Sequence, residues 1–350
     1  MTTGDLSTLL VWGAATAFTI ALIAFSADLA RIAERSQRRA PELATAGAGP
    51  GRGSRPATAV SGSEEQSAPG RSVRAEGIAR STTLLGLVML SAGIVLRGIA
   101  AGRWPTANMY EFTIVGVFVA VLVLTVVQRR RIIAFVGVLV MGIAVLALVL
   151  ALNAFFIQAD QVQPALQSYW LIIHVGVAIT ATGIFTVAFA ASVLQVLKSY
   201  REEAAADAPA VTVGASGAPV PASGAQRSDR VRRLVTGRRF GWLEQVPGSR
   251  ELEAMSFRLN AIAFVLWTLT LIGGAIWAEH AWGRYWGWDP KEVGTFVAWV
   301  VYAAYLHART TRGWSGRRAA YMVFAGYAVV LANFTVVNLF VTGKHSYSGL

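Results

Sequence analysis

The sequence of 350 residues contains no cysteine. Without a thiol, the chain can form no disulfide, hold no iron–sulfur cluster and act on no partner as a thiol reductant. If the chemistry of the protein involves thiols, those thiols belong to another molecule.

Charged residues are also scarce, at 14% of the chain against 55% hydrophobic residues and a mean hydropathy of +0.51. A membrane-spanning helix needs about 20 mostly apolar residues. Barrel strands would be about half as long and would alternate in polarity. We therefore predict an all-α fold, a polytopic membrane helical bundle of about eight transmembrane helices. The eight apolar stretches are Leu6–Ala30, Thr82–Ala101, Tyr110–Val127, Ile132–Leu152, Trp170–Leu197, Phe257–Trp277, Glu292–Ala308 and Ala319–Val341.

The net charge of +12 is concentrated in the connections between these stretches. The connections 31–80, 128–131, 198–258 and 308–318 hold 26 of the 31 Lys and Arg residues. In an eight-span topology all four lie on one face, which the positive-inside rule assigns to the cytoplasm. We therefore expect both termini on the external side, and we attribute the basic charge to topology rather than to nucleic acid.

The chain divides into five regions by composition. The flank of the first apolar run carries no positive charge, which favours a retained span over a cleaved signal peptide. Two connections rich in Ala, Gly, Ser and Pro, near 40–75 and 203–230, are typical of partly disordered linkers. The predicted regions are a first transmembrane helix at 1–30, a cytoplasmic linker at 31–80, transmembrane helices 2–5 at 81–197, a second linker at 198–256, and transmembrane helices 6–8 with the C-terminal tail at 257–350.

Tryptophan is concentrated between the sixth and seventh apolar stretches, in residues 282–292. Trp282, Tyr285, Trp286 and Trp288 could form a wall for a flat aromatic ligand. Tryptophans also gather at membrane interfaces without any ligand. The end of the segment has a structural explanation, because Asp289, Pro290 and Glu292 form the capping box of a following helix.

Histidine occurs only four times, as His174, His280, His307 and His345. All but His307 lie at the external side, near the tryptophans. His307 lies roughly 27 Å further along its helix, so one ligand cannot contact both ends and a second site is required. For any single histidine, an interfacial or structural role remains open. Arg97, near the external end of its helix, could snorkel, or serve as counter-charge for an anionic ligand group or for Glu111 or Asp289.

Haem would use all of these groups, since its iron binds imidazole, its flat ring suits aromatic walls, and its carboxylates suit Arg or Lys. Two other classes remain open. A di-haem membrane electron-transfer subunit would need two histidines for an inner haem, and only His307 is available there. A secondary transporter of a non-haem solute would show acidic residues near the membrane midplane, and Asp28 and Glu111 lie near the ends of their spans.

Residues 282–292 resemble the tryptophan-rich signature of the haem-handling proteins, and the ending Trp-Asp-Pro-Lys-Glu is similar to the CcsA/ResC branch of system II cytochrome c biogenesis. Further matches lie at 105–111, 168–175, 305–309 and 345–347, so the resemblance covers most of 80–197 and 257–350. It implies an external haem with His174 and His345 as axial ligands, and an inner haem site at His307. His280 has no role in that family. The candidate residues for binding haem b are His174, His345, His307, Trp282, Trp286, Trp288, Tyr285, Asp289 and Arg97.

The resemblance further implies haem delivery across the cell membrane and its presentation, on the external face, to apocytochrome c for thioether attachment. It implies a haem lyase-type complex in which this chain is one subunit. The expected partners are a CcsB/ResB-type membrane subunit, apocytochrome c and an external thiol-reducing, thioredoxin-like protein.

Overall fold

The computed structural model describes residues 1–46, 73–129, 134–159, 168–207 and 230–345, and every regular element in these ranges is a helix. Long apolar stretches with few breaking residues account for this, because a helix satisfies all of its interior backbone hydrogen bonds within the segment. The elements are α1 (Thr3–Ala46), α2 (Val73–Ala101), α3 (Met109–Val127), α4 (Ala134–Ala154), α5 (Tyr169–Ala206), α6 (Arg230–Thr236), the 3-10 helix η2 (Arg238–Gln245), α7 (Ser249–Trp282), α8 (Pro290–Thr311), α9 (Arg317–Phe334) and α10 (Val336–Phe340).

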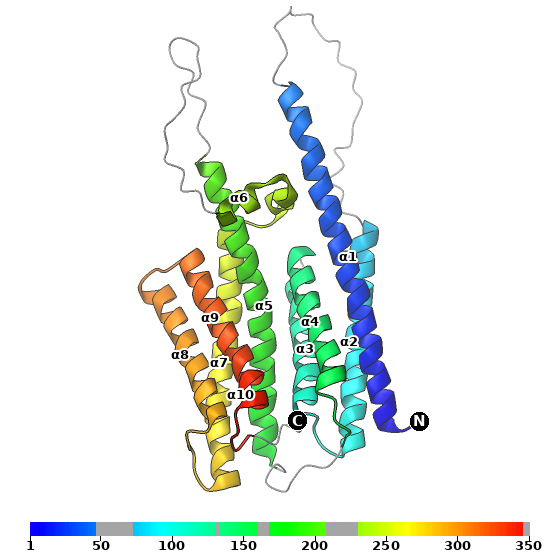
Figure 1. The fold of residues 1–350 in the computed structure, drawn as a ribbon, viewed down its shortest axis with the longest axis vertical. Coiled ribbons are helices and arrows are strands. Elements are labelled where there is room, and N and C mark those ends of the chain that lie inside the picture. Colours follow the sequence, from blue (N-terminus) through cyan, green and yellow to red (C-terminus); the bar gives the residue numbers. More distant parts are fainter. Residues whose placement is uncertain (47–72, 130–133, 160–167, 208–229, 346–350) are drawn as a thin grey trace, which may run out of the picture.

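The long helices run side by side in two groups (Figure 1). Helices α1 to α4 form one group, α7 to α9 form the other, and α5 lies between them. One apolar core joins α5 to the first group through residues such as Leu194, and a second joins α5 to the other group through residues such as Phe185. Helix α5 therefore contributes to both cores, and α7 also contributes to both, through Leu252 and Trp267.

Seven of the described helices are long and apolar enough to cross a membrane, namely α1 to α5, α7 and the α9–α10 segment. The predicted all-α membrane bundle is confirmed. The seventh predicted span, Glu292–Ala308, corresponds to α8, which is 22 residues long but falls outside that set. Lys291, Glu292, His307 and Arg309 lower its apolar character, although α8 runs alongside α7 and α9 (Figure 1).

The helices extend beyond the predicted spans into the predicted linkers. Helix α1 continues to Ala46 and α5 to Ala206, while α7 begins at Ser249. The predicted linker at 198–256 also contains α6 and η2, and Trp242 of η2 is buried and stacked on Phe135 of α4 with ring centroids 4.6 Å apart. The Ala-rich and Gly-rich parts at 47–72 and 208–229 lie outside the described residues.

The connections that carry the candidate ligand residues lie at one end of the bundle. The start of α1, the α2–α3 loop and the α7–α8 loop are together there, and the basic α8–α9 connection is at the opposite end (Figure 1). This grouping follows the predicted topology. Which end is external remains a prediction.

Candidate ligand site around two histidines

The loop between α7 and α8 is fixed at both ends by local hydrogen bonds. Gly283 ends α7 in the left-handed conformation, with φ at 69°, which glycine adopts without steric cost. Asp289 begins α8 as its N-cap, Pro290 follows it, and the side chain of Glu292 accepts the backbone N–H of Asp289 at 3.1 Å. The predicted capping box is therefore present.

Asp289 also binds the C-terminal tail. Its Oδ1 lies 2.7 Å from Nδ1 of His345, and its Oδ2 accepts the backbone N–H of Lys344. Burial raises the pKa of Asp289, but the hydrogen bonds from His345 and Lys344 outweigh it and lower that pKa to about 2. A Cβ on Gly343 would lie 2.6 Å from Oδ2 of Asp289, so only glycine allows the tail this close.

His174 is held between α5 and α7. Its Nδ1 lies 2.8 Å from the backbone carbonyl of Thr270, which can only accept, so Nδ1 carries the proton. The helices approach closely because Gly273 and Gly274 have no side chains. A Cβ on Gly274 would lie 2.7 Å from Cε1 of His174.

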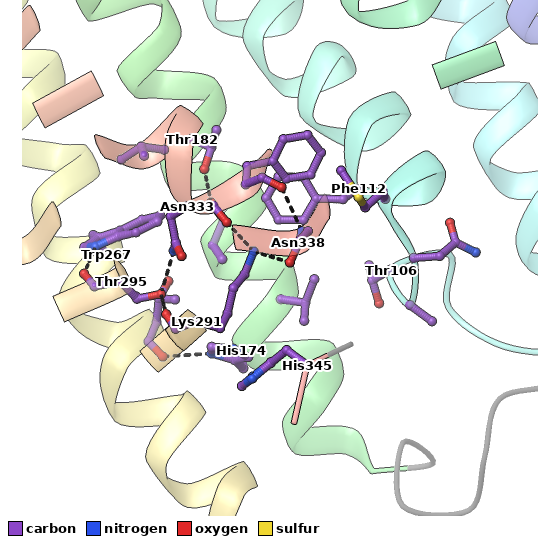
Figure 2. Close-up of a pocket in the computed structure, with 18 residues that line it drawn as sticks. Thr106, Phe112, His174, Thr182, Trp267, Lys291, Thr295, Asn333, Asn338 and His345 are labelled. Atoms are coloured by element: carbon purple, nitrogen blue, oxygen red, sulfur yellow. Dashed lines mark hydrogen bonds between the residues drawn. The ribbon is translucent and has the colours of Figure 1, made fainter. Parts of the chain in front are cut away.

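The structure brings His174 and His345 together, as Figure 2 shows, and both line the same two cavities. Each ring directs Nδ1 to an oxygen acceptor, and in a neutral imidazole this leaves the lone pair on Nε2. Histidines that bind metals usually donate their other ring N–H to a carboxylate or a carbonyl. The two histidines therefore have the second contacts typical of axial ligands.

Two cavities meet at this pair of histidines. The larger has an empty volume of about 820 Å³, including its opening, and lies between the α2–α3 connection with α3 on one side and α5, α7 and α9 on the other. The smaller, of about 400 Å³, lies on the side of the tryptophan segment. Both cavities are lined by His174, His345, Thr270, Lys291 and Thr295.

The predicted aromatic residues divide between this site and the surface. Trp282, Tyr285 and Trp286 line the smaller cavity, and the Trp282 ring meets the His345 ring edge-on at 5.3 Å. Trp288 is 75% exposed, and it lines neither cavity. It contacts Trp286 edge-on at 5.7 Å.

Trp277 and Lys291 are site residues that the sequence reasoning did not select. The Trp277 ring is buried and parallel to the His174 ring, with centroids 6.2 Å apart. Its position one turn before the end of α7, five residues before Trp282, is the signal that could have identified it. At Lys291 the sequence motif predicts only the start of a helix.

Arg97 and His307 lie elsewhere. Arg97 is buried and pairs with Glu111 at 3.0 Å, one of the partners considered for it, and it lines neither cavity. His307 is exposed on α8, 16 residues beyond Lys291 and so roughly 24 Å away along the helix. His280 is exposed, and its Nδ1 bonds the carbonyl of Ile276 in its own helix.

Known proteins are similar to this chain in sequence and in fold. Residues 106–345 match the family described as Cytochrome C assembly protein. A cytochrome c biogenesis protein CcsA from Synechococcus sp. (strain CC9902) is 33% identical over 77% of this chain and 86% of its own length. One from Prochlorococcus marinus (strain MIT 9313) is 34% identical over 74% of this chain and 80% of its own. In a solved structure, the cytochrome c heme lyase CcmF has the same fold with a TM-score of 0.59 at 14% identity, over 95% of this chain and 47% of that one.

Fold and site together define a helical membrane protein with a partly buried pair of histidines beside an aromatic segment. The chain belongs to the cytochrome c assembly protein family and is of the CcsA type.

Proposed function

We propose that the protein binds haem between His174 and His345 and presents it to apocytochrome c for covalent attachment. As a member of the cytochrome c assembly protein family, the chain acts in cytochrome c maturation. The paired Nδ1 contacts carry the proposal, because they engage Nδ1 of each imidazole with an oxygen and leave Nε2 as the ring atom that can bind iron.

The cavities on either side of the histidines suit a flat, largely apolar ligand. Phe112, Phe334 and Val330 line the larger one, while Trp282 and Trp286 line the smaller. Aromatic faces and edges favour packing against a conjugated ring. In this proposal His174 and His345 bind the iron, and Trp282, Tyr285 and Trp286 shield one side of the ring.

The attachment chemistry requires two cysteine thiols, and this chain has none. In the proposal both come from apocytochrome c, and each S–H adds across a vinyl C=C, forming one C–S and one C–H bond with no change in net oxidation state. The residues of this chain position the ring and keep its iron ligated, which gives the reacting groups a high effective concentration.

The proposal also gives a role to His307, which lies at the opposite end of α8. In the proposal His307 helps to receive haem at the cytoplasmic side, with a second ligand from a CcsB/ResB-type subunit. The pair at His174 and His345 then faces the external side of the cell membrane, where a thioredoxin-like protein keeps the apocytochrome thiols reduced.

The direct test replaces both proposed ligands with alanine, in the protein purified with its membrane partner. His174→Ala/His345→Ala should lose the Soret band of low-spin haem at the external site and should abolish formation of holocytochrome c. His280→Ala is the matched control, since its exposed ring lies outside both cavities. Normal holocytochrome c in the double variant would rule out the proposal, and a wild-type complex without any Soret band would favour a transporter of another solute.

A further inference from the structure

Lys291 places a cation where the two cavities meet. Its ammonium donates to the backbone carbonyl of Asn333 at 2.8 Å and to Oδ1 of Asn338 at 2.9 Å (Figure 2). Both acceptors are neutral. Within the described part of the chain, no carboxylate lies within the 4.0 Å of an ion pair with this ammonium.

The nearest acid is already engaged by other groups. Asp289, two residues before Lys291, accepts His345 and the backbone N–H of Lys344, while its contact with Lys291 is to the backbone N–H. A lysine ammonium has three donors, and neutral oxygens take two of them. A cation in a partly apolar cavity is costly without an opposite charge. The cavity therefore favours a ligand that brings an anionic group to Lys291.

We propose that Lys291 binds a carboxylate of the ligand held between His174 and His345. The inference rests on the proposed function, and it identifies the group that fixes the rotation of the ring. The two propionates of haem lie along one edge of the macrocycle, and its vinyl groups lie away from that edge. Binding a propionate at Lys291 turns the vinyl groups away from α8 and toward the incoming thiols.

The alternative is that Lys291 only joins α8 to the α9–α10 segment through Asn333 and Asn338. A purely structural lysine would not distinguish a ligand with free carboxylates from one without them. The probe is therefore a pair of ligands, haem and haem dimethyl ester, which share iron, ring and vinyl groups and differ only in the charge of the propionates.

The experiment titrates both ligands into the purified full-length complex and follows the Soret band. The wild type should bind haem at least about tenfold more tightly than the diester. A hydrogen bond between charged groups typically raises binding affinity by about that factor or more. Lys291→Gln should reduce haem affinity to that of the diester and leave diester binding unchanged. Unchanged diester binding also shows that the variant is folded.

Two further variants test whether the charge at Lys291, rather than a general disturbance of the site, sets the preference for haem over the diester. Asn338→Asp keeps Lys291 but places a carboxylate beside its ammonium, so it should also abolish the preference for haem. Lys344→Gln is the matched control, because Lys344 is exposed over the Trp282 ring at 5.2 Å and lines neither cavity. The proposal is overturned if Lys291→Gln retains the wild-type preference. If the wild type binds neither ligand, the proposed function fails first, and this inference fails with it.

Discussion

The rings of His174 and His345 are held by two different kinds of contact. His174 depends on a backbone carbonyl in a neighbouring helix, and His345 depends on the side chain of Asp289. Neither contact is local in sequence, since 96 and 56 residues separate the partners. Sequence alone could name the histidines but could not place their rings. The His174 ring depends on how closely α5 and α7 pack, and the His345 ring depends on the contact between the C-terminal tail and the start of α8.

Gly274 is the residue that sets this packing, and we predict that Gly274→Ala displaces the His174 ring. The new Cβ would lie 2.7 Å from Cε1 of His174 and 2.9 Å from its Nδ1. Overpacking of this kind costs about 1–3 kcal/mol. The bound haem should change from low spin toward high spin as His174 is lost as a ligand, which absorption spectroscopy of the purified complex measures.

The control for this change is Gly176→Ala on α5. A Cβ at Gly176 meets no atom within 4 Å, so the variant should keep the wild-type spectrum. A low-spin spectrum in Gly274→Ala, equal to that of the control, would show that the helices can separate without moving the ring.

At the scale of elements, the start of α8 has two roles that the sequence showed only in part. The motif Asp-Pro-Lys-Glu predicted a capping box, and the capping box is present. The same Asp289 carboxylate fixes the C-terminal tail, a contact that no local pattern indicates. Because the pKa of Asp289 is lowered to about 2, this contact is fully formed above the ordinary value of 3.8 and is lost only as the pH falls through about 2.

Substitutions at Asp289 should separate these two roles. Asparagine is also a good N-cap, so Asp289→Asn should leave α8 intact while replacing the charged acceptor of His345 with a neutral one. Removing such a second contact typically lowers metal affinity by about 10–100-fold. Asp289→Ala should lose the same affinity and a further ~1 kcal/mol of stability, because the cap is also gone.

Haem titration and thermal unfolding of the two variants provide the measurements. Asp5→Asn is the control, since among the described residues Asp5 forms hydrogen bonds only with Thr2 at the start of α1. Equal haem affinity in Asp289→Asn and the wild type would mean that the charge on the acceptor is unimportant for His345.

For the molecule as a whole, the sequence predicted more of the bundle than of its interior. Hydropathy located the spans, because the length of an apolar run is set by membrane thickness. It did not reveal α6 and η2, whose folding depends on packing of Trp242 against α4 rather than on local pattern. Nor did it show that the larger cavity lies between the two helix groups, so that its walls come from residues more than 200 positions apart.

A buried charge cluster holds the α2–α3 loop, which forms one wall of that cavity. Glu111 is fully buried, and it binds Arg97 of α2, Arg103 of the α2–α3 loop and the backbone N–H of Ala107. That loop supplies Thr106, Ala107 and Asn108 to the cavity lining. Glu111→Gln removes the only carboxylate between these two arginines among the described residues. Breaking a buried ion pair costs about 3–5 kcal/mol.

We expect Glu111→Gln to lower the thermal midpoint of the detergent-solubilised protein by several degrees and to weaken haem binding, although it contacts neither His174 nor His345. Glu76→Gln is the matched control, because its i,i+4 pair with Arg80 lies at the surface, where such pairs contribute about 0.3–0.5 kcal/mol. If both variants unfold at the wild-type temperature, the buried cluster does not hold α2, α3 and their loop together. If Glu111→Gln unfolds early but binds haem normally, the loop wall is not needed for the ligand.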